Sequence, residues 1–134
     1  MNRRDFVILS AVATCLAPMA RAAATTYSPE AVKAELAAGR TVLLNFIASW
    51  CGSCQAQGRT IDALRAEYPA YDAAIAFFDV DWDTYKDTAL AAKYGITSRG
   101  SLVLLRGDVV LAQTFTHSTE AALKALLDQA AAPA

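Results

Sequence analysis

The sequence predicts a single α/β domain in which a central mixed β-sheet is flanked by helices on both faces. Two nearly continuous apolar runs, at 41–47 and 75–80, are typical of strands buried on both faces. The helical pattern between them joins these strands by a right-handed parallel crossover. Two further apolar runs, at 101–106 and 109–115, flank the turn Gly107-Asp108 and predict an antiparallel hairpin added to the sheet.

Four helices are expected around this sheet. The first begins at Ser28, a capping residue, with Pro29 in its first turn, and Gly39 ends it. The others are predicted at 51–68, at 84–93 and from 120 to about 129, by apolar spacing of three and four residues and by the residues that start and stop them.

Composition limits the class of protein. The chain has 134 residues, 55% of them hydrophobic, and a formal net charge of −1. This is enough apolar material for one well-packed domain. No basic patch indicates binding to nucleic acid, and a monomer is expected.

The first 22 residues have the features of an export signal. Arg3 and Arg4 precede an apolar stretch at 6–16, and Ala20-Arg21-Ala22 forms a small-x-small cleavage site. The paired arginines resemble a twin-arginine signal, with the general secretory route as the alternative. An uncleaved anchor is disfavoured because the apolar stretch is shorter than the roughly 20 residues that span a bilayer. The predicted mature domain is 23–134, located in the periplasm.

The motif Trp50-Cys51-Gly52-Ser53-Cys54 lies between the first buried strand and the second helix. Cysteines three apart at a helix start lie one turn from each other, close enough for a disulfide. The free N–H groups and the positive dipole end of the helix stabilise a thiolate at the first cysteine. The motif therefore predicts thiol–disulfide chemistry. A purely structural disulfide is the alternative, although closing so short a loop adds little stability.

The order of elements and the WCGSC motif resemble the thioredoxin family over about 27–129. The segments at 44–54, 92–96 and 104–108 carry the resemblance. It implies the thioredoxin fold, with Cys51 as the exposed nucleophile and Cys54 as the buried resolving thiol. Trp50 would pack beside the disulfide, and Gly52 and Ser53 would form the turn that tunes its redox poise.

Three positions depart from the family pattern. Ser53 replaces a proline between the cysteines. Asn45 stands where the family has a buried acid that helps to move a proton from the resolving cysteine, and an amide cannot act as that base. Gly100, in the predicted substrate loop Arg99-Gly100-Ser101, replaces a cis-proline that faces the disulfide. We expect a trans peptide and a different loop shape here, because a cis bond without proline is costly.

These residues predict an exported thiol–disulfide oxidoreductase that needs no cofactor and acts more as a reductase. Its expected partners are proteins or small molecules with disulfides or thiols, and the resemblance suggests a membrane thiol transporter as electron donor. Two alternatives remain: a periplasmic carrier of copper(I) or another soft metal that uses the same cysteines, and a non-catalytic thiol-binding domain.

His117 is the only histidine in the sequence. It follows the last predicted strand and is far from the cysteines along the chain. We therefore expect an exposed or capping role for it, and no metal site, because two cysteines and a remote histidine do not complete a tetrahedral zinc site.

Overall fold

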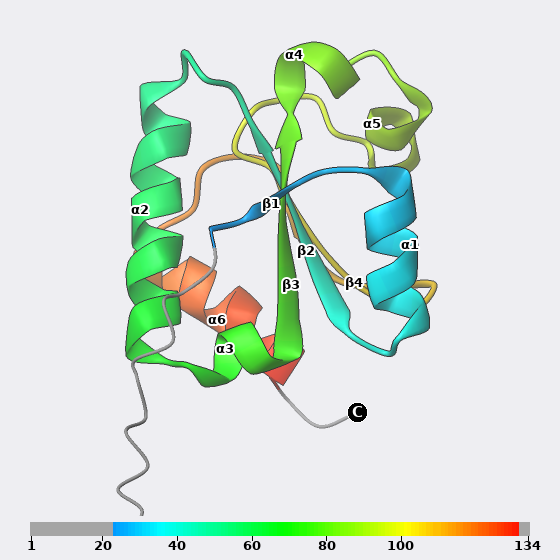
Figure 1. Ribbon diagram of the computed structural model, residues 1–134. Helices are drawn as coiled ribbons and strands as arrows, with labels where there is room; N and C mark the ends of the chain where they lie inside the picture. Colours follow the sequence, from blue (N-terminus) through cyan, green and yellow to red (C-terminus); the bar gives the residue numbers. More distant parts are fainter. Residues whose placement is uncertain (1–22, 132–134) are drawn as a thin grey trace, which may run out of the picture.

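A five-stranded mixed sheet forms the centre of the molecule (Figure 1), with strands in the order β1-β3-β2-β4-β5. The computed structural model describes residues 23–131. The strands are β1 (Thr25–Thr26), β2 (Thr41–Ile47), β3 (Ile75–Asp81), β4 (Leu102–Arg106) and β5 (Val109–Thr114). The helices are α1 (Pro29–Ala37), α2 (Gly52–Glu67), α3 (Ala70–Ala74), α4 (Trp82–Tyr85), α5 (Ala89–Tyr94) and α6 (Glu120–Ala131).

Strand directions confirm the predicted sheet. β2 and β3 are parallel, with Asn45 opposite Asp79. β4 runs antiparallel to β2, with Leu102 opposite Asn45, and β5 runs antiparallel to β4, with Thr114 opposite Leu102. The carboxyl ends of β2, β3 and β5 therefore lie at the same edge of the sheet, which we call the carboxyl edge.

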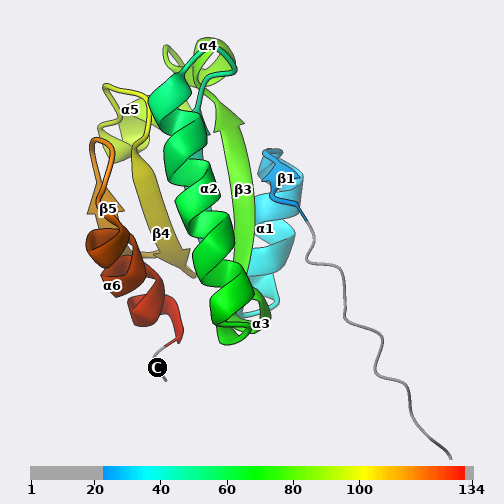
Figure 2. The same cartoon turned by 90° about the vertical axis from the view of Figure 1, so that its left-hand side faces the viewer.

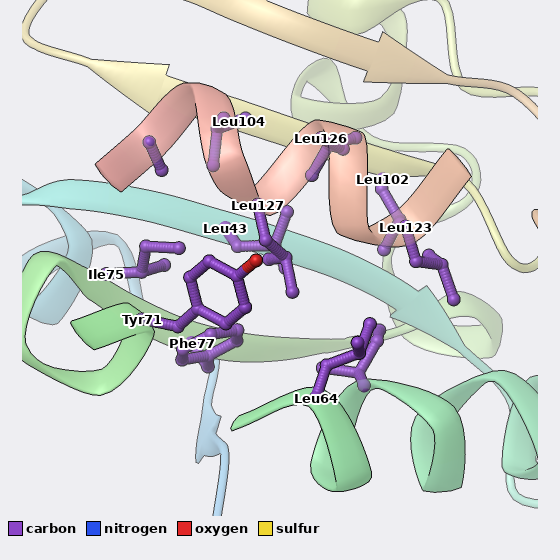
Figure 3. Close-up of a cluster of buried hydrophobic side chains, with 12 residues drawn as sticks. Leu43, Leu64, Tyr71, Ile75, Phe77, Leu102, Leu104, Leu123, Leu126 and Leu127 are labelled. Atoms are coloured by element: carbon purple, nitrogen blue, oxygen red, sulfur yellow. The ribbon is translucent and has the colours of Figure 1, made fainter. Parts of the chain in front are cut away.

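Helices cover both faces of the sheet, as predicted (Figures 1 and 2). On one face, side chains of α2, α3 and α6 pack on inward residues of β2, β3 and β4, and Leu43, Leu104 and Leu127 are almost completely buried there. Figure 3 shows this cluster, with Leu127 of α6 directed at Leu43 and Tyr71. On the other face, α1 and α5 cover a second apolar cluster that includes Phe46 and Val103.

Local structure departs from the sequence prediction in three places. The helix expected at 84–93 is divided into α4 and α5. The chain leaves the helical conformation at Thr88, whose hydroxyl and backbone N–H both donate to the carbonyl of Tyr85. The short strand β1 and the single-turn helix α3 were not predicted, because each is too short to show a hydrophobic period.

The predicted export signal at 1–22 lies outside the described residues. Within 23–131, none of the helices combines the length and the apolar character required to cross a membrane.

Candidate active site

The two cysteines lie at the carboxyl edge, where β2 leads into α2. Cys51 is the N-terminal capping residue of α2, and its Sγ accepts the backbone N–H of Cys54 at 3.2 Å. The two residues form a disulfide, with Cα atoms 5.3 Å apart. Ser53 Oγ lies 3.6 Å from Cys51 Sγ. The sulfur of Cys51 thus lies among the free N–H groups of a helix start, an arrangement that favours a thiolate.

Both cysteines are buried, which corrects the expectation of an exposed nucleophile. Cys51 exposes 4% of its surface and Cys54 exposes 3%. Cys54, in the first turn of α2, is buried as predicted, whereas Cys51 is in addition approached by a side chain from the chain beyond β5. That side chain is His117, whose Nε2 lies 3.9 Å from Cys51 Sγ.

The position of His117 overturns the prediction that it is remote from the cysteines. The residue is partly buried and lies just beyond β5, which ends at Thr114. Strand directions explain the approach: two antiparallel pairings make β5 parallel to β2, so both strands end at the carboxyl edge. The hairpin was predicted from sequence, so this argument could have placed His117 near the cysteines.

Gly100 provides the space that His117 occupies. Its φ is +82°, and no cis peptide occurs in the described part of the chain, which confirms the expected trans loop. The backbone N–H of Gly100 donates to the carbonyl of Phe46 at 2.7 Å. A Cβ added to Gly100 would lie 2.6 Å from His117 Nε2. Glycine is therefore required both by the left-handed backbone and by the imidazole ring.

Gln57, a residue of α2, binds both the loop of Gly100 and the loop of His117 through its side chain. Its side chain is 4% exposed, its Nε2 donates to the carbonyl of Gly100 at 3.0 Å, and its Oε1 accepts the backbone N–H of Ser118 at 2.8 Å. Gln57 was not predicted from the sequence. The available signal was its position three residues after Cys54, on the buried stripe that continues through Ile61 and Leu64, where a polar side chain needs partners.

Trp50 marks the exposed side of the site. Its ring is 59% exposed, its Nε1 donates to Asp83 at 2.8 Å, and the Arg99 guanidinium lies 4.4 Å from the ring centroid. Arg99, in the predicted substrate loop, thus contacts the residue beside Cys51. Ser101, the last residue of that loop, is buried and donates to the carbonyl of Ser98.

Asn45 lies in the sheet and lines a cavity of about 190 Å³ under α2. It is buried, and its Oδ1 has no hydrogen-bond partner among residues 23–131. Asp79, directly opposite on β3, lines the same cavity. Burial raises the pKa of the Asp79 carboxyl, the charge of Asp62 raises it further, and Arg65 opposes the shift. This carboxylate was not predicted from the sequence as part of the site, although the register of β2 and β3 could have revealed it.

One group of donor atoms in the described part of the chain is compact enough to hold a metal ion. The sulfurs of Cys51 and Cys54 and a ring nitrogen of His117 lie within 4.8 Å of one another. Thiolates, rather than disulfides, bind metals, so reduction would have to come first. A structural zinc site takes four protein ligands, and this group offers three.

Comparisons with known proteins agree with this architecture. The sequence model described as Thioredoxin matches residues 22–129. Thioredoxin C-2 of Corynebacterium nephridii is 31% identical over 88 residues, covering 66% of this chain and 77% of that protein. A thioredoxin of Chlorobaculum thiosulfatiphilum is 35% identical over 74 residues, 55% of this chain and 64% of that one. Thioredoxin H-type of Fagopyrum esculentum is 34% identical over 68 residues, 51% and 53% of the two chains. The match thus spans about half to two thirds of these last two relatives.

Solved structures show the same fold. The crystal structure of Trxlp from Edwardsiella tarda EIB202 is similar with a TM-score of 0.68 and 28% identity, covering 78% of this chain and 98% of that one. Thioredoxin Mala s 13 of Malassezia sympodialis has a TM-score of 0.68 at 23% identity, covering 84% and 94% of the two chains, and supports the fold alone. With the family match extending over most of its length, the chain belongs to the thioredoxin family.

Proposed function

We propose that this protein is an exported thiol–disulfide oxidoreductase. The observation that carries the proposal is the Cys51–Cys54 disulfide at the start of α2, with Cys51 Sγ at the free N–H groups of the helix. A helix start lowers the free energy of a thiolate relative to the thiol, and the thiolate is the nucleophile in disulfide exchange. Membership of the thioredoxin family supports the same chemistry.

The reaction follows from the two cysteine positions. In the reduced protein, the Cys51 thiolate attacks a client disulfide and forms a mixed disulfide. Cys54 then attacks Cys51 Sγ, which restores the internal disulfide and releases the reduced client. The Cα separation of 5.3 Å in the disulfide form lies within the usual range for such a bond, so the fold accommodates the product of the second step.

For the direction of transfer, we propose reduction of protein or small-molecule disulfides in the periplasm, with a membrane thiol transporter as electron donor. The predicted signal at 1–22 supports this setting. N-terminal sequencing of the exported protein tests the localisation. A mature chain that begins at Ala23 supports it, and retention of Met1–Ala22 on a cytoplasmic protein contradicts it.

The activity is tested by insulin reduction with dithiothreitol as the electron source. The wild-type protein should accelerate the reaction. Cys51→Ser should abolish the acceleration, and Cys54→Ser should accumulate a mixed disulfide at Cys51, because the resolving thiol is lost. A wild-type protein that gives no acceleration under these conditions would contradict the oxidoreductase function.

A periplasmic copper(I) carrier is the second candidate, favoured by the third donor atom that His117 brings within 4.8 Å of both sulfurs. Soft thiolates suit copper(I). A copper(I) titration of the reduced protein against a competing chelator separates the two functions. Tight one-to-one binding without insulin reduction would support the carrier, whereas reduction with weak copper binding would support the oxidoreductase.

A further inference from the structure

We propose that His117 is a catalytic residue that exchanges a proton with Cys51 and pairs with its thiolate. The inference rests on the proposed oxidoreductase function. In this proposal, the imidazole occupies the space beside the disulfide that is free because Gly100 has no side chain. The contact that supports it is the 3.9 Å separation between His117 Nε2 and Cys51 Sγ, within hydrogen-bonding reach for sulfur.

Two features of the structure hold the imidazole at this position. The ring lies against Gly100 so closely that no Cβ would fit between them. Gln57 binds the Gly100 carbonyl with its amide nitrogen and the N–H of Ser118, the residue after His117, with its amide oxygen. One buried side chain on α2 therefore fixes both the loop that makes room for the ring and the loop that carries it.

The chemistry of the pair suits proton transfer between nitrogen and sulfur. Histidine is the side chain whose charge most readily changes between pH 5 and 8, and an imidazolium close to a cysteine favours its thiolate. Cys51 is 4% exposed, so water screens this interaction poorly. The helix start stabilises the same thiolate from the other side through the Cys54 N–H.

The other charged and titratable groups around Cys51 come from three elements. Cys54 lies on α2, Arg99 lies in the loop before β4, and Asp81 and Asp83 lie at α4. Arg99 stacks on Trp50, Asp83 accepts a hydrogen bond from Trp50, and Asp81 caps α4 through Thr84. Apart from Cys54, none of these groups has a hydrogen-bond contact to Cys51 Sγ in the described part of the chain, whereas His117 has one.

In the proposed reaction, proton transfer from Cys51 to His117 precedes the formation of the new S–S bond. The Cys51 thiol gives its proton to His117 Nε2, leaving a thiolate and an imidazolium. The thiolate forms a bond to one client sulfur, the client S–S bond breaks, and the departing client thiolate takes the proton from the imidazolium. Cys54 then forms a bond to Cys51 Sγ and displaces the second client sulfur, which receives the Cys54 proton directly or through water. The client gains two electrons and the cysteine pair loses them.

The test is the pH dependence of Cys51 alkylation by iodoacetamide in the reduced mature protein, measured by mass spectrometry with a metal chelator present. His117→Gln keeps a polar side chain without a titrating proton. We expect it to move the rate profile to higher pH and to lower the alkylation rate at pH 6 about tenfold. Thr116→Ala, an exposed neighbour in the same turn, is the matched control and should leave the profile unchanged.

The redox equilibrium provides a second readout. Loss of the imidazolium destabilises the reduced form, so a tenfold change in the equilibrium constant would make the potential of His117→Gln about 30 mV more negative. Gly100→Ala should reproduce the alkylation shift of His117→Gln, because its methyl group displaces the ring. In a His117→Ala background, the same change should shift the profile no further.

The proposal is overturned if His117→Gln and the wild type share one alkylation profile while both reduce insulin. It is also overturned if the two profiles differ only when the chelator is left out, since a bound metal would then be the cause of the difference. Failure of the oxidoreductase function itself gives a different result, in which the wild-type protein does not reduce insulin whatever its alkylation profile.

Discussion

The middle of the sheet and its carboxyl edge are held together by different interactions. In the middle, α2, α3 and α6 pack on β2 and β4 through apolar side chains such as Leu43, Leu104 and Leu127, each almost completely buried. At the edge, the loops that carry Gly100 and His117 are fixed to α2 by hydrogen bonds from one side chain, Gln57. A substitution in the middle of the sheet should therefore lower the free energy of unfolding. A substitution at the carboxyl edge should mainly change the reactivity of Cys51.

The largest effect on stability is expected in the middle of the sheet. Leu104→Ala removes a fully buried side chain and leaves a cavity, so we expect the free energy of unfolding to fall by about 2–5 kcal/mol. Denaturant unfolding of the oxidised protein measures this loss. The protein that remains folded should keep the wild-type alkylation profile of Cys51. A shifted profile would show that the two regions are not separable.

Gln57→Ala should affect both properties. It leaves the Gly100 carbonyl and the Ser118 N–H without their buried partner, which should lower the free energy of unfolding by about 1–3 kcal/mol. It also frees the loop of His117, so the alkylation profile of Cys51 should move toward that of His117→Gln. Thr60→Ala, one turn further along α2, removes only a hydrogen bond to the Ala56 carbonyl and is the control. A stability loss with an unchanged profile would restrict Gln57 to a structural role.

The same contrast explains what could be predicted from the sequence. β2, β3 and the hairpin are apolar runs with clear boundaries, so the sheet and its directions followed from local pattern. The WCGSC motif placed Cys51 and Cys54 because the strand and the helix beside it are contiguous in the chain. His117 comes from 66 positions beyond Cys51, and its contact depends on how β5 pairs. The roles of Gln57 and Asp79 likewise depend on partners that are distant in sequence.

Asn45→Asp tests whether the missing acid limits the reaction. We expect it to speed the release of mixed disulfides several-fold, because a carboxylate can accept the proton of the resolving thiol. The new group would lie opposite Asp79 in one cavity, and two carboxylates there disfavour double ionisation. Exchange rates across pH measure the first effect. An unchanged rate and pH profile would remove residue 45 from the mechanism.

The smallest effect is expected from Asp79→Asn, which removes the carboxylate and keeps its shape. Burial raises the pKa of Asp79, so its charged form is disfavoured in the folded protein. The carboxyl therefore favours folding most below its unfolded pKa, and this contribution is lost as pH rises through the higher folded pKa. Asp79→Asn should raise the free energy of unfolding at pH 7 by less than about 1 kcal/mol.

The gain from Asp79→Asn should shrink on acidification and disappear below about pH 3, where the carboxyl is protonated in both the folded and the unfolded state. Denaturant unfolding at pH 7 and pH 4 checks this sign.

The double variant Asn45→Asp, Asp79→Asn moves the single carboxylate from β3 to β2 and provides the sharper comparison. If position alone matters, the double variant should release mixed disulfides as fast as Asn45→Asp, without the penalty of two adjacent carboxylates. Equal rates in the double variant and the wild type would mean that Asp79 already serves the cysteines from its own strand.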